Sequence, residues 1–121
     1  MPHFVIDCSE SVLSSHDEEY ILEQIHLVAN STELLDEGDI KVRLNPFKKY
    51  LVSNKREGFI HVFAYIMQGR TTKQKANLSK KMVSKLATLF SDIPNIAINI
   101  SAFEKATYCN KGMLSVESYS V

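Results

Sequence analysis

The sequence has few of the features that mark membrane, secreted or disulfide-linked proteins. No apolar run approaches the roughly 20 residues of a transmembrane helix. The first residues lack the basic start and apolar core of a signal peptide. Only two cysteines are present, Cys8 and Cys109, and their wide separation favours reduced thiols over a disulfide framework. We therefore expect a cytoplasmic protein with no membrane association.

Motifs for cofactors and metals are also missing. The four histidines have no metal-ligand spacing with one another or with the cysteines. The chain has no phosphate loop, dinucleotide fingerprint or nucleophile elbow. We expect a protein that uses no cofactor and no metal.

Basic residues are absent from the first third of the chain. Residues 1–40 contain ten Asp or Glu and no Lys or Arg, whereas residues 41–121 contain fourteen Lys or Arg and four acids. The net charge of zero is thus a balance of −10 and +10. Solvated helix faces that attract one another, on one sheet or between subunits, explain this polarity better than nucleic-acid binding does. A ferredoxin-like module that binds nucleic acid through a lysine-rich second helix is the less favoured alternative, because the aromatic platform often used for such binding is missing.

What the chain does contain is an alternation of short apolar strands and amphipathic helices. Two segments, 15–18 and 71–74, have the capping-box spacing of a helix start. Apolar spacing predicts, in chain order, a strand over 2–8, a helix from about 17 to 32 or 35, strands over 40–44 and 59–67, a helix that stops before Pro94, and a strand from 96 to 103 or 104. Extended structure at 50–52 and a small terminal strand or docking segment at 113–114 are further expectations.

This order predicts an α/β (α+β) fold, a tandem β-α-β repeat in a single domain over 1–121. The halves cover about 2–52 and 58–104, and a C-terminal tail follows. The first strand reads as buried on both faces, which suggests a four-stranded mixed sheet with both helices on one face. Because the chain has so few helices, another copy of it is the natural cover for the second face. We therefore expect a closed oligomer.

The start of the chain holds the first candidate catalytic group. Pro2 follows the initiator and leads into an apolar strand. If Met1 is removed, Pro2 becomes a secondary amine with a reference pKa of roughly 8, lowered further by burial or by a nearby cation. Such an amine can act as a general base near neutral pH. The alternative is that a proline is simply tolerated at the first residue of a strand.

A second candidate lies between the third strand and the second helix. Gly69-Arg70-Thr71 places an arginine at a strand end and beside a helix N-terminus. Backbone N–H groups, the helix dipole and a guanidinium then converge on one point, which suits a carboxylate. A surface Gly-Arg turn is the alternative interpretation.

These features together resemble a known family. Pro2-His3-Phe4, Gly69-Arg70-Thr71 with Gln74-Lys75 following, the doubled β-α-β order and the length are similar to the tautomerase superfamily, most closely to 5-carboxymethyl-2-hydroxymuconate delta-isomerases. The resemblance covers essentially the whole chain. It implies a tautomerase-like homotrimer and a cofactor-independent isomerase of aromatic compound catabolism. The implied substrate is a small anionic, carboxylated enol, with neither nucleic acid nor membrane as a partner.

The resemblance also implies roles for individual residues. Pro2 would be the base that returns the proton as an acid, and Arg70 would hold a substrate carboxylate or stabilise developing charge. Arg43 matches the second arginine of a family Arg-x-Arg pair, whereas Lys41 occupies the place of the first. A lysine keeps the charge and loses the bidentate fork. His3, next to the proposed base, is expected to line the substrate pocket.

Two features leave a non-catalytic function open. Lys41 departs from the family pattern, and a retained Met1 would convert the Pro2 nitrogen into a tertiary amide without a basic lone pair. A tautomerase-like binding or interaction protein that has lost catalysis is therefore the alternative to the isomerase.

Overall fold

Two strands with alternating burial form the centre of the molecule. The computed structural model describes residues 1–114, and in it β1 (His3–Ser9) runs antiparallel to β3 (Phe59–Met67). Every second side chain of both strands is buried, because a strand turns successive side chains to opposite faces. The strand predicted over 59–67 is confirmed, with both ends of β3 correct.

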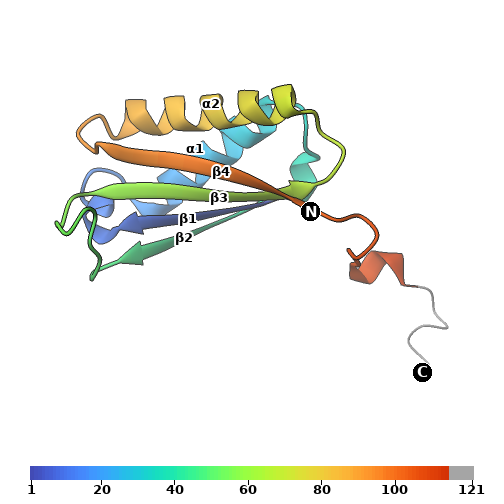
Figure 1. Cartoon of the computed structure of the whole chain (residues 1–121), viewed down its shortest axis with the longest axis horizontal. Helices are drawn as coiled ribbons and strands as arrows, with labels where there is room; N and C mark the ends of the chain where they lie inside the picture. Colours follow the sequence, from blue (N-terminus) through green and yellow to red (C-terminus); the bar gives the residue numbers. More distant parts are fainter. Residues whose placement is uncertain (115–121) are drawn as a thin grey trace.

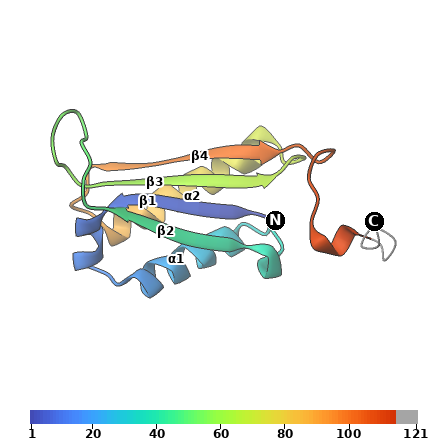
Figure 2. The ribbon, with the colours of Figure 1, turned by 90° about the horizontal axis from the view of Figure 1, so that it is seen from below.

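Each central strand has a parallel partner at its outer side. β2 (Lys41–Phe47) pairs with β1, and β4 (Asn95–Phe103) pairs with β3, which gives the order β2-β1-β3-β4 (Figure 2). The two parallel connections are α1 (Glu18–Ser31) and α2 (Thr72–Leu89), and both helices cover one face of the sheet (Figure 1). The predicted four-stranded mixed sheet with two helices on one face is confirmed.

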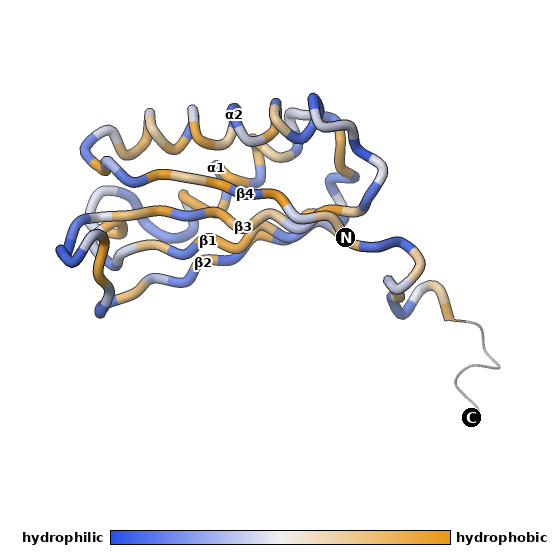
Figure 3. The backbone as a smooth tube through the Cα atoms, viewed as in Figure 1, coloured by the Kyte–Doolittle hydropathy of each residue, from blue (hydrophilic) through white to orange (hydrophobic). Residues whose placement is uncertain are grey.

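The core lies between the helices and this covered face. Figure 3 shows hydrophobic residues concentrated along the strands and hydrophilic residues at the loops. The fully buried side chains come from both central strands and both helices, and they include Phe4, Ile6, Ile21, Ile25, Val62, Leu78, Met82 and Leu86. Neither helix of residues 1–114 combines the length and apolar character needed to cross a membrane.

Each helix begins at a side-chain cap, and the sequence predicted one of the two caps correctly. At α2 the predicted capping box is confirmed, since Thr71 accepts from the Gln74 N–H and Gln74 accepts from the Thr71 N–H. At α1 the predicted cap at Ser15 is wrong, and Asp17 accepts from the Tyr20 N–H instead. A 3-10 helix, η1 (Glu10–Ser14), precedes α1, and the Ser15 hydroxyl donates back to a carbonyl of that turn.

Three other expectations are corrected. Residues 50–52 form no strand, and Val52 makes only an isolated bridge to Lys55 across two residues with positive φ. Residues 113–114 form no strand either, because Met113 belongs to the 3-10 helix η3 (Lys111–Met113) and Leu114 caps its end. β1 is not buried on both faces of the single chain: the second-face residues His3, Val5 and Asp7 are half-buried.

The η2 connection (Glu37–Asp39) and the start of the C-terminal tail lie at the end of the sheet where the N-terminus lies. η2 joins α1 to β2, and its carboxylate cap Asp36 accepts from the Gly38 N–H. The tail leaves β4 at this same end and extends away from the sheet (Figures 1 and 2). The start of the chain, the start of β2 and the start of the tail therefore lie at the same end of the sheet.

Candidate active site

The backbone of Pro2 is joined to the first residue of β2. The Pro2 carbonyl accepts from the Lys41 N–H at 3.0 Å, and Pro2 is buried. In the parallel register His3 lies opposite Lys41, and Val5 opposite Arg43. These four side chains project from the same face of the sheet, the face opposite the helices, which we call the open face. The strand pairing thus brings both β2 cations beside the start of the chain.

His3 and Arg43 are in direct contact. Arg43 Nη1 lies 3.0 Å from His3 Nδ1, and the His3 ring is half-buried. Burial, followed by the charges of Arg43 and Lys41, lowers the pKa of His3 from its usual value of 6.5. His3 is therefore held as a neutral ring within a cationic patch.

One aromatic side chain, Phe103, lies against His3 and belongs to a small aromatic cluster. The Phe103 ring meets His3 edge-on, with centroids 6.0 Å apart, and it also packs near Tyr65 and Tyr108. We did not predict this cluster from the sequence. Strand alternation indicates that Tyr65 and Phe103 face the same way as His3, but only the sheet register brings the three rings together.

Arg70 lies at the same end of the sheet but binds backbone. It follows Gly69, whose φ of 111° is one that glycine adopts most readily. The Arg70 guanidinium donates to the Leu34 carbonyl at 2.6 Å and to the Met67 carbonyl at 3.4 Å. Its contacts within the chain therefore hold the α1–β2 connection against the end of β3.

The structure thus gathers four of the five predicted site residues closely, namely Pro2, His3, Lys41 and Arg43. With Met1 removed, a secondary amine would lie beside two cations. This arrangement suits an anionic substrate that exchanges a proton. The carboxylate-binding role of Arg70 stays a prediction.

The remaining candidate side chains lie elsewhere. Cys8 is fully buried, and burial raises the pKa of its thiol to about 11. Cys109 is free and exposed. His61, on the open face of β3, lies 2.6 Å from Asn99 Oδ1. Within residues 1–114, no group of three or more His, Cys, Asp or Glu side chains is placed to hold a metal ion.

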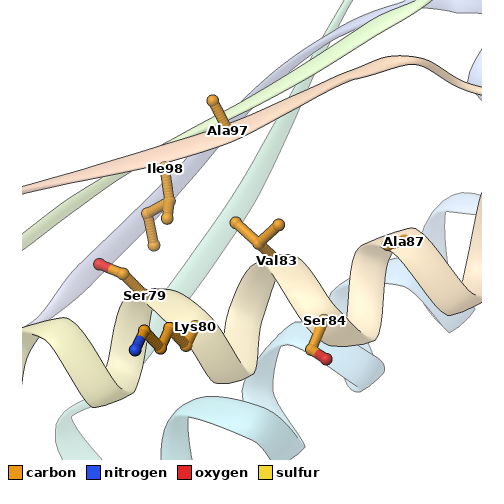
Figure 4. A pocket seen from close by; sticks show the side chains of 7 residues that line it. All are labelled: Ser79, Lys80, Val83, Ser84, Ala87, Ala97 and Ile98. Carbon is orange, nitrogen blue, oxygen red and sulfur yellow. The ribbon is translucent and has the colours of Figure 1, made fainter.

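A separate groove runs between α2 and the edge strand β4. It has a volume of about 600 Å³, and the side chains of Val83 and Ile98 face it together with Lys80 and Ser84 (Figure 4). β4 is two strands away from β1 in the sheet order. The groove is mainly apolar and contains no acid, histidine or cysteine, so we do not assign the chemistry to it.

Comparison with solved structures shows the same fold in proteins of very different sequence. A 5-carboxymethyl-2-hydroxymuconate isomerase from Deinococcus radiodurans R1 is 18% identical, with a TM-score of 0.79 over 91% of this chain and 88% of that one. A fused 4-OT symmetric trimer is 10% identical, with a TM-score of 0.73 over 98% and 99%. A macrophage migration inhibitory factor-like protein from Entamoeba histolytica is 12% identical, with a TM-score of 0.69 over 90% and 94%.

Sequence comparison is consistent with this likeness. No curated protein matches the chain. The model of the 5-carboxymethyl-2-hydroxymuconate isomerase family, however, matches residues 2–109, which include every predicted site residue. This match supports an isomerase or tautomerase function. The chain belongs to the 5-carboxymethyl-2-hydroxymuconate isomerase family.

Proposed function

We propose that this protein is a cofactor-independent isomerase that moves a proton within an unsaturated, carboxylated enol such as 5-carboxymethyl-2-hydroxymuconate. The observation that supports this most is the position of Pro2, buried at the start of a central strand and bonded through its carbonyl to the strand that carries Lys41 and Arg43. Substrates of this class arise when aromatic rings are cleaved. Removal of Met1 is a requirement of the proposal.

In the proposed chemistry one proton moves in two steps, first to Pro2 and then from Pro2 back to the substrate. The neutral Pro2 amine takes the proton from the enol oxygen, and the electron pair of that O–H bond forms the carbonyl as the double bond shifts. The Pro2 ammonium then returns the proton to a carbon of the chain, so the substrate and product have the same atoms. Nearby cations favour the neutral amine and stabilise the enolate charge.

The cations divide the work of holding the substrate. Arg43 can bind a carboxylate through a bidentate fork, whereas Lys41 offers a point charge. Arg70 donates to two backbone carbonyls and retains further N–H donors. We propose that these donors meet a second carboxylate or the developing negative charge.

We further propose that the working form is a homotrimer. Aromatic residues on the open face, Phe59, Phe63 and Tyr65, are only half-buried in the single chain. A second copy would remove this apolar surface from water, and burial of apolar surface stabilises an assembly by roughly 25 cal/mol per Å². The fold neighbour with 10% identity is a symmetric trimer. Sedimentation analysis would test this state.

The proposal for Pro2 is tested by intact-mass measurement combined with an assay of enol ketonisation. We expect mature protein without Met1 to ketonise 5-carboxymethyl-2-hydroxymuconate. Either Pro2→Ala or a form with Met1 retained should lose about 10²–10⁴-fold in kcat. Pro46→Ala, at the far end of β2, is the matched control and should retain activity. Undiminished turnover by either the Pro2 variant or the Met1-retaining form would exclude the proposed mechanism.

A binding protein without catalysis is the second candidate. The observation in its favour is that the Arg70 guanidinium is already bound to the Leu34 carbonyl. This candidate predicts that dicarboxylates bind to protein from the native source, that this protein retains Met1, and that no turnover occurs. A measured turnover above the uncatalysed rate would exclude it.

A further inference from the structure

The contact between His3 and Arg43 determines the protonation state of the ring. A guanidinium has only donors, so Arg43 Nη1 must donate to His3 Nδ1 across their 3.0 Å separation. His3 Nδ1 therefore carries a lone pair, and the ring is neutral with its hydrogen on Nε2. A protonated His3 would lose this acceptor and would place a second positive charge against the guanidinium.

The surroundings of His3 reinforce the neutral ring. On β2 its neighbours are Lys41 and Arg43, and on β3 its partner in the antiparallel register is Tyr65. Phe103 covers one edge of the ring. Burial comes first among the effects that lower the pKa of His3, and Arg43, Lys41 and the N-terminal amine follow. The ring thus stays neutral to a lower pH than an exposed histidine would.

We propose that His3 is a positioning residue, whose Nδ1 holds the Arg43 guanidinium in the orientation that meets a substrate carboxylate beside Pro2. This proposal rests on the proposed function, and it replaces the simpler idea that His3 only lines the pocket. Arg43 is exposed and has a long, flexible side chain. An acceptor that restricts it before the substrate arrives lowers the ordering cost of binding.

The register explains why Arg43 is the cation that is held. His3 lies directly opposite Lys41, so Arg43 is its diagonal neighbour, within reach of a long side chain. The Lys41 ammonium is instead 3.4 Å from the Asp39 carbonyl. His61 and Asn99 have the same diagonal relation in the second half, without a cation. Proximity alone could therefore create such pairs, and the test must separate positioning from mere contact.

Two substitutions make that separation. His3→Asn places an amide oxygen near the position of Nδ1 and cannot titrate in the acid range. His3→Phe keeps a flat ring against Phe103 and has no acceptor. For 5-carboxymethyl-2-hydroxymuconate we expect His3→Phe to raise KM about tenfold while kcat changes much less, as fits the loss of a bond to a charged group. His3→Asn should keep the wild-type KM.

The pH profile gives a second signature. In the wild type KM should rise as the pH falls through the lowered pKa of His3, because protonation releases Arg43. In His3→Asn this rise should be absent. His61→Phe, the matched control on the open face, should keep both the KM and its pH profile. An equal rise in KM for His3→Phe and His3→Asn, or no rise for either, would overturn the proposal.

A measurement independent of turnover keeps this test apart from that of the proposed function. Long-range ¹H–¹⁵N correlation of the histidine rings should show His3 with its hydrogen on Nε2, the signal being assigned by its loss in His3→Asn. Arg43→Gln should raise the pKa of His3 toward 6.5. A hydrogen on Nδ1, or an unchanged titration, would overturn the proposal. If turnover is absent, the dissociation constant of glutarate replaces KM, with the same expected order of variants.

Discussion

The two β-α-β halves share a backbone plan, but their strand starts differ in chemistry. In the first half the Pro2 carbonyl accepts from the N–H of Lys41, the first residue of β2. In the second half the Gly58 carbonyl accepts from the side chain of Asn95, the first residue of β4, at 3.2 Å. Gly58 and Asn95 therefore occupy the places of Pro2 and Lys41. A neutral amide stands where the first half has a cation.

The same correspondence holds further along the strands. Phe59 occupies the place of His3, and Ala97 occupies the place of Arg43. A free amino terminus can exist at only one strand start in each chain. The fold thus contains two similar β-α-β halves, and the candidate site lies in the half that begins at the chain terminus. Stability should be shared between the halves, whereas activity should not.

The largest expected effect tests the shared stability. Ile6 in β1 and Ile60 in β3 are 1% and 2% exposed on the covered face. Ile6→Ala and Ile60→Ala should each lower the free energy of unfolding by about 3 kcal/mol, because each leaves a cavity in a packed core. Denaturant unfolding at one fixed protein concentration measures both losses. A loss confined to one variant would show that one half carries the stability alone.

The next effect tests the unequal chemistry. Arg43→Ala should lower kcat/KM by about 10²-fold, roughly 2.7 kcal/mol, because it removes the guanidinium that we propose binds a substrate carboxylate. Asn99→Ala removes a polar side chain from the open face of the second half and is the matched control. Steady-state kinetics of both variants make the comparison. A similar loss in Asn99→Ala would mean that the second half also serves the reaction.

A smaller effect is expected at Lys41, where the chain departs from its family pattern. Lys41→Ala should raise KM about tenfold, roughly 1.4 kcal/mol, because one cation for the anionic substrate is lost. Lys41→Arg restores a bidentate fork and should leave KM equal to or below that of the wild type. A higher KM for Lys41→Arg than for Lys41→Ala would show that a carboxylate is not what Lys41 meets.

The fold was largely predictable because its signals are local. The run from 59 to 67 is apolar except for His61 and lies between turn residues, so β3 was predicted with both ends correct. Edge position explains why β2 continues through Pro46: a proline costs little on a strand whose outer side has no partner strand within residues 1–114. The missed cap at Ser15 has a local cause too, because the η1 turn takes up that hydroxyl.

The candidate site was predictable as residues and not as contacts. The chain resembles its family at Pro2, Arg43 and Arg70, and those positions follow from the motifs. The His3–Arg43 bond joins residues 40 apart, and it depends on the register between β1 and β2. The direction of Arg70 depends on the Leu34 carbonyl, 36 residues earlier in the chain. Alternation along a strand predicts which face of the sheet a side chain lies on. The residue that it contacts on the next strand depends on the register, which the sequence pattern does not give.

The smallest effect returns to the two halves through their helix caps. Asp17→Ala and Thr71→Ala should each lower the free energy of unfolding by about 1 kcal/mol, because each leaves an N–H of the first helical turn without its acceptor. Ser15→Ala is the control, since Ser15 has the capping-box spacing but bonds to the preceding turn. Its loss should be well below that of Asp17→Ala in the same denaturant titration. If Ser15→Ala proved the more costly, the start of α1 would be determined by the η1 turn, and the two helices would begin by different physical means.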